Sequence, residues 1–365
     1  MAERLVFAGA GDIILDRDEP LTALQNVRDI LIDADVTYIN MEQVLCDGGT
    51  PKPGHAVSKG TRFVEVYKDA QVDVVSTATN HAMDWGPDGL AESLATLDAA
   101  GVAHAGTGAN LAEARKPAII ERKGVKFGFL NYCSVHPSGY EATDTKPGLA
   151  PLKVDTIYRP FEEQPGTPPV IITRPTLESE KMITEDVAAL KEQVDIVVVI
   201  FHWGQHLLDY VIPQYCTEIA HEACDAGADM IVSSHTHILK GIEVYDGKPI
   251  YYSFGNFVED FGKAFAAGDD NIMIQRLNWH YFGQPTKPNA DKAAMTIIAK
   301  ACIEDGKIVQ FGFMPGKIID GNPTMLKRDE GGQEVVDYMT WITEAAHLNA
   351  KFEWINDEEV KVVEA

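Results

Sequence analysis

Residues 228–237 of the chain have the sequence ADMIVSSHTH, an apolar run that ends in two histidines separated by one residue. A short apolar run of this kind is typical of a buried strand, so His235 and His237 are expected where that strand ends. Side chains two apart in a strand lie on one face, and the spacing therefore predicts two imidazoles directed at one point. An isolated pair of this kind is equally typical of surface or core histidines, and only the rest of the chain can decide between the two.

Apolar runs that end in polar clusters recur along the chain. They are RLVFAGAGD, DVTYINME, VDVVSTATNH, VKFGFLNYCSV and DIVVVIFHWG. Helical patterns lie between the early runs, for example Leu90, Leu94 and Leu97 after the Gly86-Pro87 pair. This alternation predicts an α/β fold with a largely parallel sheet.

The domain organisation follows from length and composition. The chain has 365 residues, 45% of them hydrophobic, and no repeat or low-complexity tract, which indicates one globular domain over residues 1–365. Clustered prolines predict a loop-rich segment at about 147–176, and weak periodicity predicts an insertion or lid at about 258–291. The pairs Asp246-Gly247 and Asp305-Gly306 predict hairpin turns, and the acidic end of the chain after a helix at 333–348 is expected to be a solvated tail.

The net charge of −24 and the cysteine pattern restrict partners and location. A strongly negative surface repels nucleic acid and anionic membranes, so neither is expected to bind. Five cysteines without a CxxC pair indicate free thiols in a reducing compartment. No stretch has the pattern of a signal peptide or of a membrane span, and these features together predict a cytoplasmic protein that acts on a small-molecule substrate.

Polar residues of a particular kind follow the predicted strands. They are Asp12, Asn40, Glu42, Asn80, His81, Asp84, His202, His235 and His237. Because the carboxyl ends of strands in an α/β sheet line one crevice, side chains from separate segments can converge there. Carboxylates, an amide and imidazoles without a thiolate suit one or two divalent ions such as Mn, Fe or Zn. Taken alone, Asp12 is equally typical of a helix cap and Asn80 of a turn.

The order of the motifs GDI, NME, TNHAMDWG, FHWG, SSHTH and YYSFGNF resembles the CapA-type proteins of the poly-γ-glutamate capsule-synthesis family, which is itself similar to the calcineurin-like metallophosphoesterases. The resemblance covers most of the chain and implies a four-layer αββα sandwich with one or two metal ions between the sheet ends. It also implies a role for each site residue. The metal ligands would be Asp12, Glu42 as the bridging carboxylate, Asn80, His202, His235 and His237, and His81 would meet the substrate.

The sequence departs from the phosphoesterase pattern at four positions. Ile14 stands where that pattern has a histidine, so one metal position lacks a nitrogen ligand, and the bridging residue Glu42 replaces an aspartate. Ser234 replaces a glycine, and His206 stands where CapA-type proteins often have a glutamate. These differences favour the metal position of Glu42, Asn80, His202 and His235 over that of Asp12 and His237.

Further candidates surround the predicted metal ligands. His81 could protonate a leaving group with Asp84 as its orienting partner, although Asp84 is equally typical of a helix cap. The remaining substrate-binding candidates are Lys59, Arg62, Trp203, His206 and Asn256. For Lys59 and Arg62 an exposed surface pair is the simpler alternative, and for Trp203 core packing is.

The leading hypothesis is a metal-dependent hydrolase in which a metal-activated water attacks a small amide, lactone or similar carboxyl derivative. The missing nitrogen ligand at Ile14 weakens the two-metal clamp that phosphoryl transfer uses, which leaves a phosphoesterase as the nearest alternative. A role in poly-γ-glutamate synthesis, a metal-dependent epimerase and a non-catalytic binding protein are the others. Three observations would distinguish these classes. Hydrolysis would identify a hydrolase, deuterium uptake at a substrate α-carbon without hydrolysis would identify an epimerase, and failure to hold metal would favour a binding protein.

Overall fold

The computed structural model describes residues 4–52, 57–164, 166–260 and 290–365, and it contains two large β-sheets. The larger sheet has the strand order β19-β20-β17-β16-β1-β2-β3-β4, with β15 beside β1 and β18 beside β17. Strands β1 to β4 are parallel, as the alternation of apolar runs and helices predicts. The strands of this sheet are β1 (Leu5–Ile14), β2 (Val36–Met41), β3 (Val74–Ser76), β4 (Ala103–Ala105), β15 (Asn256–Glu259), β16 (Met295–Glu304), β17 (Lys307–Ile319), β18 (Asn322–Met325), β19 (Ala350–Trp354) and β20 (Val360–Glu364).

The smaller sheet has the order β13-β14-β12-β11-β7-β6, with a parallel centre formed by β7, β11 and β12. Its strands are β6 (Ala118–Arg122), β7 (Val125–Cys133), β11 (Ile196–His202), β12 (Met230–Ser234), β13 (Ile242–Tyr245) and β14 (Lys248–Tyr251). Asp246-Gly247 forms the predicted turn between β13 and β14, and Asp305-Gly306 the one between β16 and β17, all four residues with positive φ.

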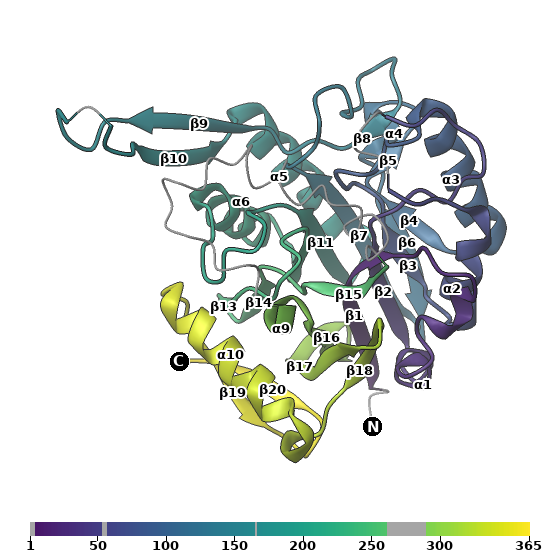
Figure 1. Ribbon diagram of the computed structural model, residues 1–365, viewed down its shortest axis with the longest axis vertical. Helices are drawn as coiled ribbons and strands as arrows, with labels where there is room; N and C mark the ends of the chain where they lie inside the picture. The colour runs from purple at the N-terminus through teal and green to yellow at the C-terminus, as the bar shows by residue number, and fades with distance from the viewer. Residues whose placement is uncertain (1–3, 53–56, 165, 261–289) are drawn as a thin grey trace.

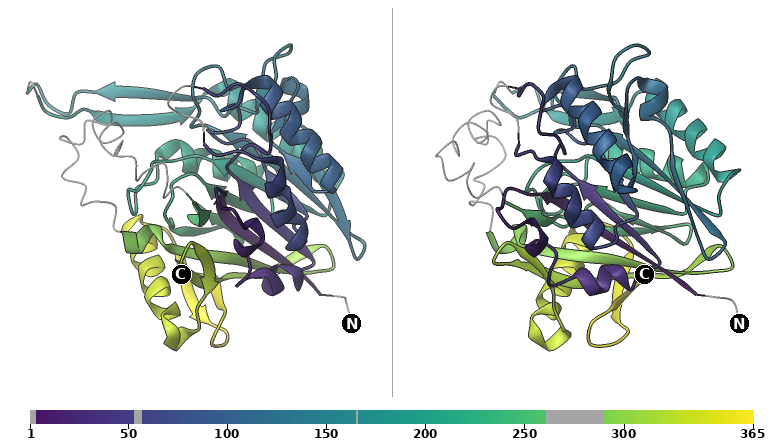
Figure 2. Two further views of the ribbon diagram at one scale, coloured as in Figure 1. Left: turned by 45° about the vertical axis from the view of Figure 1, so that its right-hand side comes forward. Right: turned by 90° about the vertical axis from the view of Figure 1, so that its right-hand side faces the viewer.

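The two sheets pack face to face and helices cover their outer faces, which gives the four-layer αββα sandwich that the sequence predicts (Figures 1 and 2). The side-chain alternation of β11 shows the layering directly. Val198 packs in the core between the sheets, whereas Val197 and Val199 pack against the outer helices. The helices on the larger sheet are α1 (Arg28–Ile32), α2 (Val64–Asp69) and α3 (Gly86–Ala100); those on the smaller sheet are α5 (Leu177–Lys191) and α6 (Gln214–Asp225).

The chain ends in strands and not in a solvated tail, so that prediction is wrong. After α10 (Gly332–Ala345), strand β19 pairs with β20, and β20 pairs with β17 at the edge of the larger sheet. Val360 and Val362 are buried there, and the half-buried Lys361 lies between them on the opposite face of the strand. The acidic composition of this segment hides a two-residue apolar period, which is the pattern of a half-buried strand.

The segment at about 147–176 also has more structure than its prolines indicate. It contains an antiparallel hairpin of β9 (Val154–Arg159) and β10 (Val170–Pro175), which extends away from the body of the molecule (Figure 1). Ile157 and Tyr158 on this hairpin are largely exposed. An insertion was predicted at 258–291, and most of it, residues 261–289, lies outside the described part of the chain. Its first residues form the end of β15, and its last two residues begin helix α9 (Ala290–Ala293).

Several short elements complete the fold. They are the turns η1 (Pro20–Thr22), η2 (Thr61–Phe63) and η4 (Arg328–Glu330), helix α4 (Leu111–Ala114) and strands β5 (Thr107–Gly108) and β8 (Gly148–Leu149). Among the residues that the structure describes, no helix has both the length and the apolar composition needed to cross a bilayer.

Candidate metal centre

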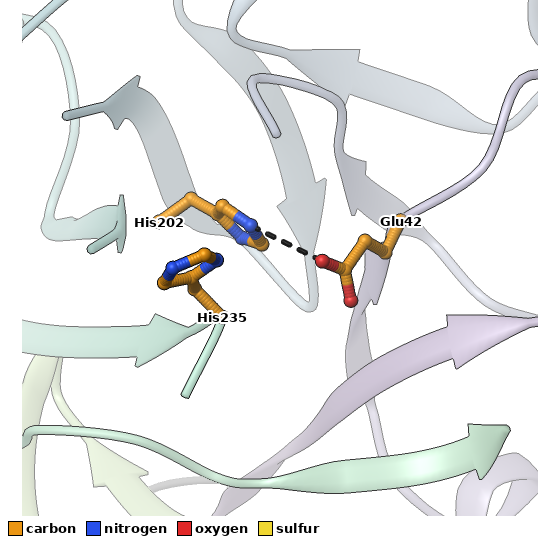
Figure 3. Close-up of side chains that lie close together, drawn as sticks. All are labelled: Glu42, His202 and His235. Carbon is orange, nitrogen blue, oxygen red and sulfur yellow. Dashed lines mark ion pairs between the residues drawn. The ribbon is translucent and has the colours of Figure 1, made fainter. Parts of the chain in front are cut away.

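The polar residues that the sequence places after separate strands meet between the ends of the two sheets. Glu42 follows β2 and His202 is the last residue of β11, while His235 and His237 follow β12. Ligand atoms of Glu42, His202 and His235 lie within 4.8 Å of one another, and so do those of Asp12, Glu42 and His237. Figure 3 shows the first group, in which the Glu42 carboxylate faces the two imidazoles. Glu42 belongs to both groups, as expected for a bridging carboxylate.

A local irregularity of β1 positions Asp12. The pairing of β1 shifts between Ala10 and Asp12 against β2, and between Asp12 and Ile13 against β15, so Gly11 is left out of the register. A Cβ at Gly11 would lie 2.0 Å from the carbonyl oxygen of Gly255, and only glycine allows this close approach. Asp12 therefore lies within β1 and does not cap a helix.

The two histidines of the SSHTH motif do not reach the site by strand alternation, contrary to the sequence-based expectation. Strand β12 ends at Ser234, and both His235 and His237 have positive φ values, 94° and 56°. Their ring centres are 6.3 Å apart, so each histidine joins a different one of the two ligand groups. Positive φ is unfavourable for a residue with a Cβ, and such backbone strain is concentrated at functional sites.

The site has the unsatisfied polar atoms that a bound ion would satisfy. Among the described residues, both carboxylate oxygens of Glu42 and the Nδ1 atoms of His202 and His235 are buried without a hydrogen-bond partner. Glu42 and His202 have no exposed surface. Buried polar groups are normally paired, and a carboxylate left unpaired is especially costly. This donor set fits a divalent ion, with Glu42, His202 and His235 as the residues that would hold it.

Asn80 completes the first group. Its Oδ1 atom lies 2.7 Å from Nε2 of His202, and the same nitrogen lies 3.3 Å from Oε1 of Glu42. The amide, the imidazole and the carboxylate are thus gathered around one position, as the sequence predicts for the metal position of Glu42, Asn80, His202 and His235. The backbone of Asn80 belongs to the turn after β3, but the side chain of Asn80 faces the site.

Burial determines the protonation of the metal-free site. It raises the pKa of Glu42 well above its ordinary value, with the nearby carboxylate of Asp12 contributing in the same direction, and it raises the pKa of Asp12 to about 6. Burial also lowers the pKa values of His202 and His235 well below their ordinary value. The imidazoles are therefore neutral at pH 7, which is the form that binds a metal ion.

Asp84 orients His81 and does not cap the following helix. Its Oδ2 atom lies 2.7 Å from Nδ1 of His81, and its Oδ1 atom accepts a hydrogen bond of 2.9 Å from the hydroxyl of Tyr140. Helix α3 begins after Trp85 without a side-chain cap. Because a carboxylate only accepts, the contact places the proton of His81 on Nδ1. Tyr140 is a contributor that the sequence motifs did not indicate.

Two amide side chains hold the second ligand group. Asn40 donates a 2.6 Å hydrogen bond to Oδ1 of Asp12, and Oδ1 of Asn256 lies 2.7 Å from Nδ1 of His237. Asn256 also donates to Glu259. Asn256 therefore acts on His237 and through it on the site, a different role from the substrate contact that the sequence suggests. The position of Asn40, at the end of the NME strand, was the available signal for its role.

Comparison with known proteins shows the family of the chain. Residues 6–261 match the family described as bacterial capsule synthesis protein PGA_cap. The chain belongs to this family. The PGA biosynthesis protein CapA of Bacillus subtilis is 34% identical over 213 residues, which are 58% of this chain and 48% of that protein. A probable polyglutamine synthesis accessory protein of Mycobacterium tuberculosis is 30% identical over 192 residues, 52% of this chain and 45% of that protein. The chain thus spans about half the length of these relatives.

Solved structures show more distant similarity. A hypothetical protein from Thermus thermophilus has 17% sequence identity and a TM-score of 0.47, with 86% of this chain and 99% of that chain covered. The calcineurin-like phosphoesterase YfkN from Bacillus subtilis has 13% identity and a TM-score of 0.43, with 95% and 100% covered.

The remaining candidates of this PGA_cap protein have different surroundings. The His206 ring lies against the site, with ring centres 4.0 Å from His235 and 5.1 Å from His237. Trp203 is in the core, where it stacks on Phe201 at 4.4 Å and is only 1% exposed. This favours the packing role of Trp203 over substrate contact, the alternative that the sequence leaves open.

Lys59 and Arg62 are bound by backbone carbonyls of the PGA_cap chain. Lys59 donates to the carbonyls of Asp47 and Gly48, and its ammonium lies 4.0 Å from the centre of the Trp85 ring. Arg62 donates to the carbonyls of Arg17 and Asp18. These contacts join Lys59 to residues 47–48 and Arg62 to residues 17–18, and they give both cations a structural role.

Proposed function

We propose that this protein is a metal-dependent hydrolase that acts on a small amide, lactone or similar carboxyl derivative. The observation that carries the proposal is the Glu42 carboxylate, which is buried beside His202 and His235 and whose two oxygens accept no hydrogen bond from the described residues. An arrangement of this kind is costly in the absence of a cation and favourable with one. When bound, a divalent ion lowers the pKa of a coordinated water and polarises a substrate oxygen.

The residues around the ligands supply the other requirements of hydrolysis. His81 is buried beside the ligand Asn80 in the chain, and its contact with Asp84 holds the ring in one tautomer. An oriented imidazole next to the reacting atoms can transfer a proton to the leaving group. Asn40 and Asn256 hold Asp12 and His237, so the second ligand group is also kept in one orientation.

A carboxyl derivative is preferred over a phosphate ester because of the composition of the second group. Asp12 and Glu42 contribute two carboxylates and His237 a single imidazole, while Ile14 occupies a position that has no ligand atom. A dianionic phosphate would meet these carboxylates, and Lys59 and Arg62 already donate to backbone carbonyls. An uncharged amide or lactone carbonyl does not suffer this repulsion.

The experiment combines metal content with a substrate panel. Protein loaded with Mn²⁺, Fe²⁺ or Zn²⁺ is assayed on chromogenic esters, lactones and anilides and, in parallel, on p-nitrophenyl phosphate and its diester. Turnover of the carboxyl derivatives that disappears in Glu42→Gln supports the proposal. Rapid turnover of the phosphate esters would establish a phosphoesterase instead, and deuterium uptake at a substrate α-carbon without hydrolysis would establish an epimerase.

A second function is favoured by the names of the relatives. CapA of Bacillus subtilis is called a PGA biosynthesis protein, and the family carries a capsule-synthesis description. Under this alternative the chain acts on or binds poly-γ-glutamate, a polyanion that the net charge of −24 would repel. Tight binding of poly-γ-glutamate at physiological salt would favour this function over the hydrolase.

A further inference from the structure

We propose that His206 is a metal ligand, and that it supplies a second imidazole to the ion position formed by Asp12, Glu42 and His237. This inference rests on the proposed metal-dependent function. It assigns His206 to the metal centre in place of a substrate contact.

The first reason is the number of donors in each group. One group has Glu42, His202 and His235, with the Oδ1 atom of Asn80 beside His202. Within the described residues, the other has Asp12, Glu42 and His237. A zinc ion takes four ligands in tetrahedral geometry, and Mn²⁺ and Fe²⁺ take more. The second position therefore has room for a further donor from the protein.

The second reason is the spacing of the rings. Two imidazoles that bind one ion through bonds of about 2.1 Å at a near-tetrahedral angle have ring centres roughly 5 Å apart. His202 and His235, which belong to the same group, are 4.9 Å apart. His206 and His237 are 5.1 Å apart, whereas His235 and His237, in different groups, are 6.3 Å apart. The separation of His206 and His237 is thus that of two ligands on one ion.

The third reason is an available nitrogen. In the described part of the chain, Nε2 of His206 is buried and has no hydrogen-bond partner. The groups of described residues whose ligand atoms lie within 4.8 Å of one another do not include His206. The proposal therefore includes a rotation of the His206 side chain toward His237 when the ion binds.

The backbone around His206 is fixed, so a side-chain rotation is sufficient. Leu207 donates a backbone hydrogen bond of 3.0 Å to the carbonyl of Thr236, between the two histidines of the SSHTH motif. The ammonium of Lys240, which is 2% exposed, donates to the carbonyls of Leu208 and Val211. These contacts join the segment that carries His206 to the segment that carries His235 and His237.

The test observes the imidazole nitrogens directly. Full-length protein with ¹⁵N-labelled histidine is titrated with Zn²⁺, and the ring nitrogen resonances are followed by NMR, with His206→Ala used to assign those of His206. We expect the Nε2 resonance of His206 to shift together with that of His237. By calorimetry, His206→Ala and His206→Gln should lose roughly tenfold or more in affinity for one of two Zn²⁺ ions and keep the other. His347→Asn is the control, because His347 is exposed and Asn tolerates its φ of 59°.

The possible results separate this inference from the proposed function. If Zn²⁺ shifts the resonances of His202, His235 and His237 while those of His206 stay unchanged, His206 is not a ligand and the metal-dependent function still stands. If Zn²⁺ shifts no imidazole resonance, both proposals are wrong. The titrated protein is the wild-type chain, and the His206→Ala variant enters the NMR experiment only for the assignment of the His206 resonances.

Discussion

The amide oxygen of Asn256 lies 2.7 Å from Nδ1 of His237, and the amide nitrogen of Asn256 donates to Glu259. This pair of contacts fixes the tautomer and the plane of the His237 ring, because the amide oxygen can only accept. Asn256→Leu should therefore weaken Mn²⁺ binding by roughly 10- to 100-fold, measured by calorimetry. Asn256→Asp keeps an acceptor and should bind more tightly than the leucine variant. Asn26→Leu, which changes an exposed amide, should bind Mn²⁺ like the wild type.

Replacement of Glu42 by glutamine should raise the stability of the metal-free protein and lower its metal binding. Burial raises its pKa, so folding at pH 7 requires either proton uptake or a buried charge. Glu42→Gln removes that cost, and we expect the metal-free variant to gain about 1 kcal/mol or more in the free energy of unfolding, since one pKa unit corresponds to about 1.4 kcal/mol. The same variant should lose bound metal, measured by plasma mass spectrometry. A variant that retained a full complement of metal would show that Glu42 is not a ligand.

Metal addition should stabilise the wild-type protein. An ion that binds only the folded chain raises the free energy of unfolding by about 2.7 kcal/mol at 100 times its dissociation constant. We expect Mn²⁺ or Zn²⁺ to raise the urea midpoint, and a chelator to reverse the change. His235→Ala should not respond in the same way, since it removes one imidazole of the first group. Equal midpoints with and without metal in the wild type would contradict a metal centre.

Asp84 should affect turnover without affecting metal content. Asp84→Asn replaces the carboxylate that lies 2.7 Å from Nδ1 of His81, so the imidazole is no longer held by a charged acceptor. We expect turnover of the identified substrate to fall by about tenfold or more, with the metal content unchanged. Tyr140→Phe removes only the hydrogen bond from the tyrosine hydroxyl to Oδ1 of Asp84 and should have a smaller effect. Loss of metal in Asp84→Asn would show that Asp84 supports the ligands instead.

Lys240 should give stability a distinct pH dependence. Burial lowers its pKa from 10.5 to about 7, so between pH 7 and 10.5 the unfolded chain binds one proton more than the folded chain. The contribution of Lys240 to the free energy of unfolding therefore rises with pH across that range, by up to about 1.4 kcal/mol per pH unit. Below pH 7 this contribution is constant. Urea unfolding of the wild type and of Lys240→Met at pH 7, 8 and 9 measures the difference. Identical slopes in the two proteins would contradict the lowered pKa.

Most of the fold follows from local patterns that the sequence displays. Apolar runs such as residues 196–202 are strands, and the helical spacing of Leu90, Leu94 and Leu97 belongs to helix α3. The errors have a common origin. In both cases the composition was misleading. Strand β20 lies in an acidic segment, and the β9–β10 hairpin, whose residues are mostly exposed or half-buried, lies among prolines.

The site was predictable in its members but not in its geometry. The side chains of Glu42, Asn80, His202 and His235 meet as their positions after strands predict. The positive φ values of His235 and His237 come from tertiary contacts that no two-residue spacing can indicate. For the same reason the hydrogen-bond partners of Asn40 and Tyr140 were not predictable, because each partner is distant in the chain.

The ligands come from both sheets of the sandwich. Asp12 and Glu42 extend from strands of the larger sheet, and His202 and His235 from strands of the smaller one. An ion held by these residues would be a cross-link between two layers whose shared core is largely apolar. The sheets could then neither slide nor separate without breaking coordination bonds. Metal loss would loosen the sandwich at the mouth of the site first, and slowed amide hydrogen exchange at the ends of β1 and β11 would be the signature of a loaded centre.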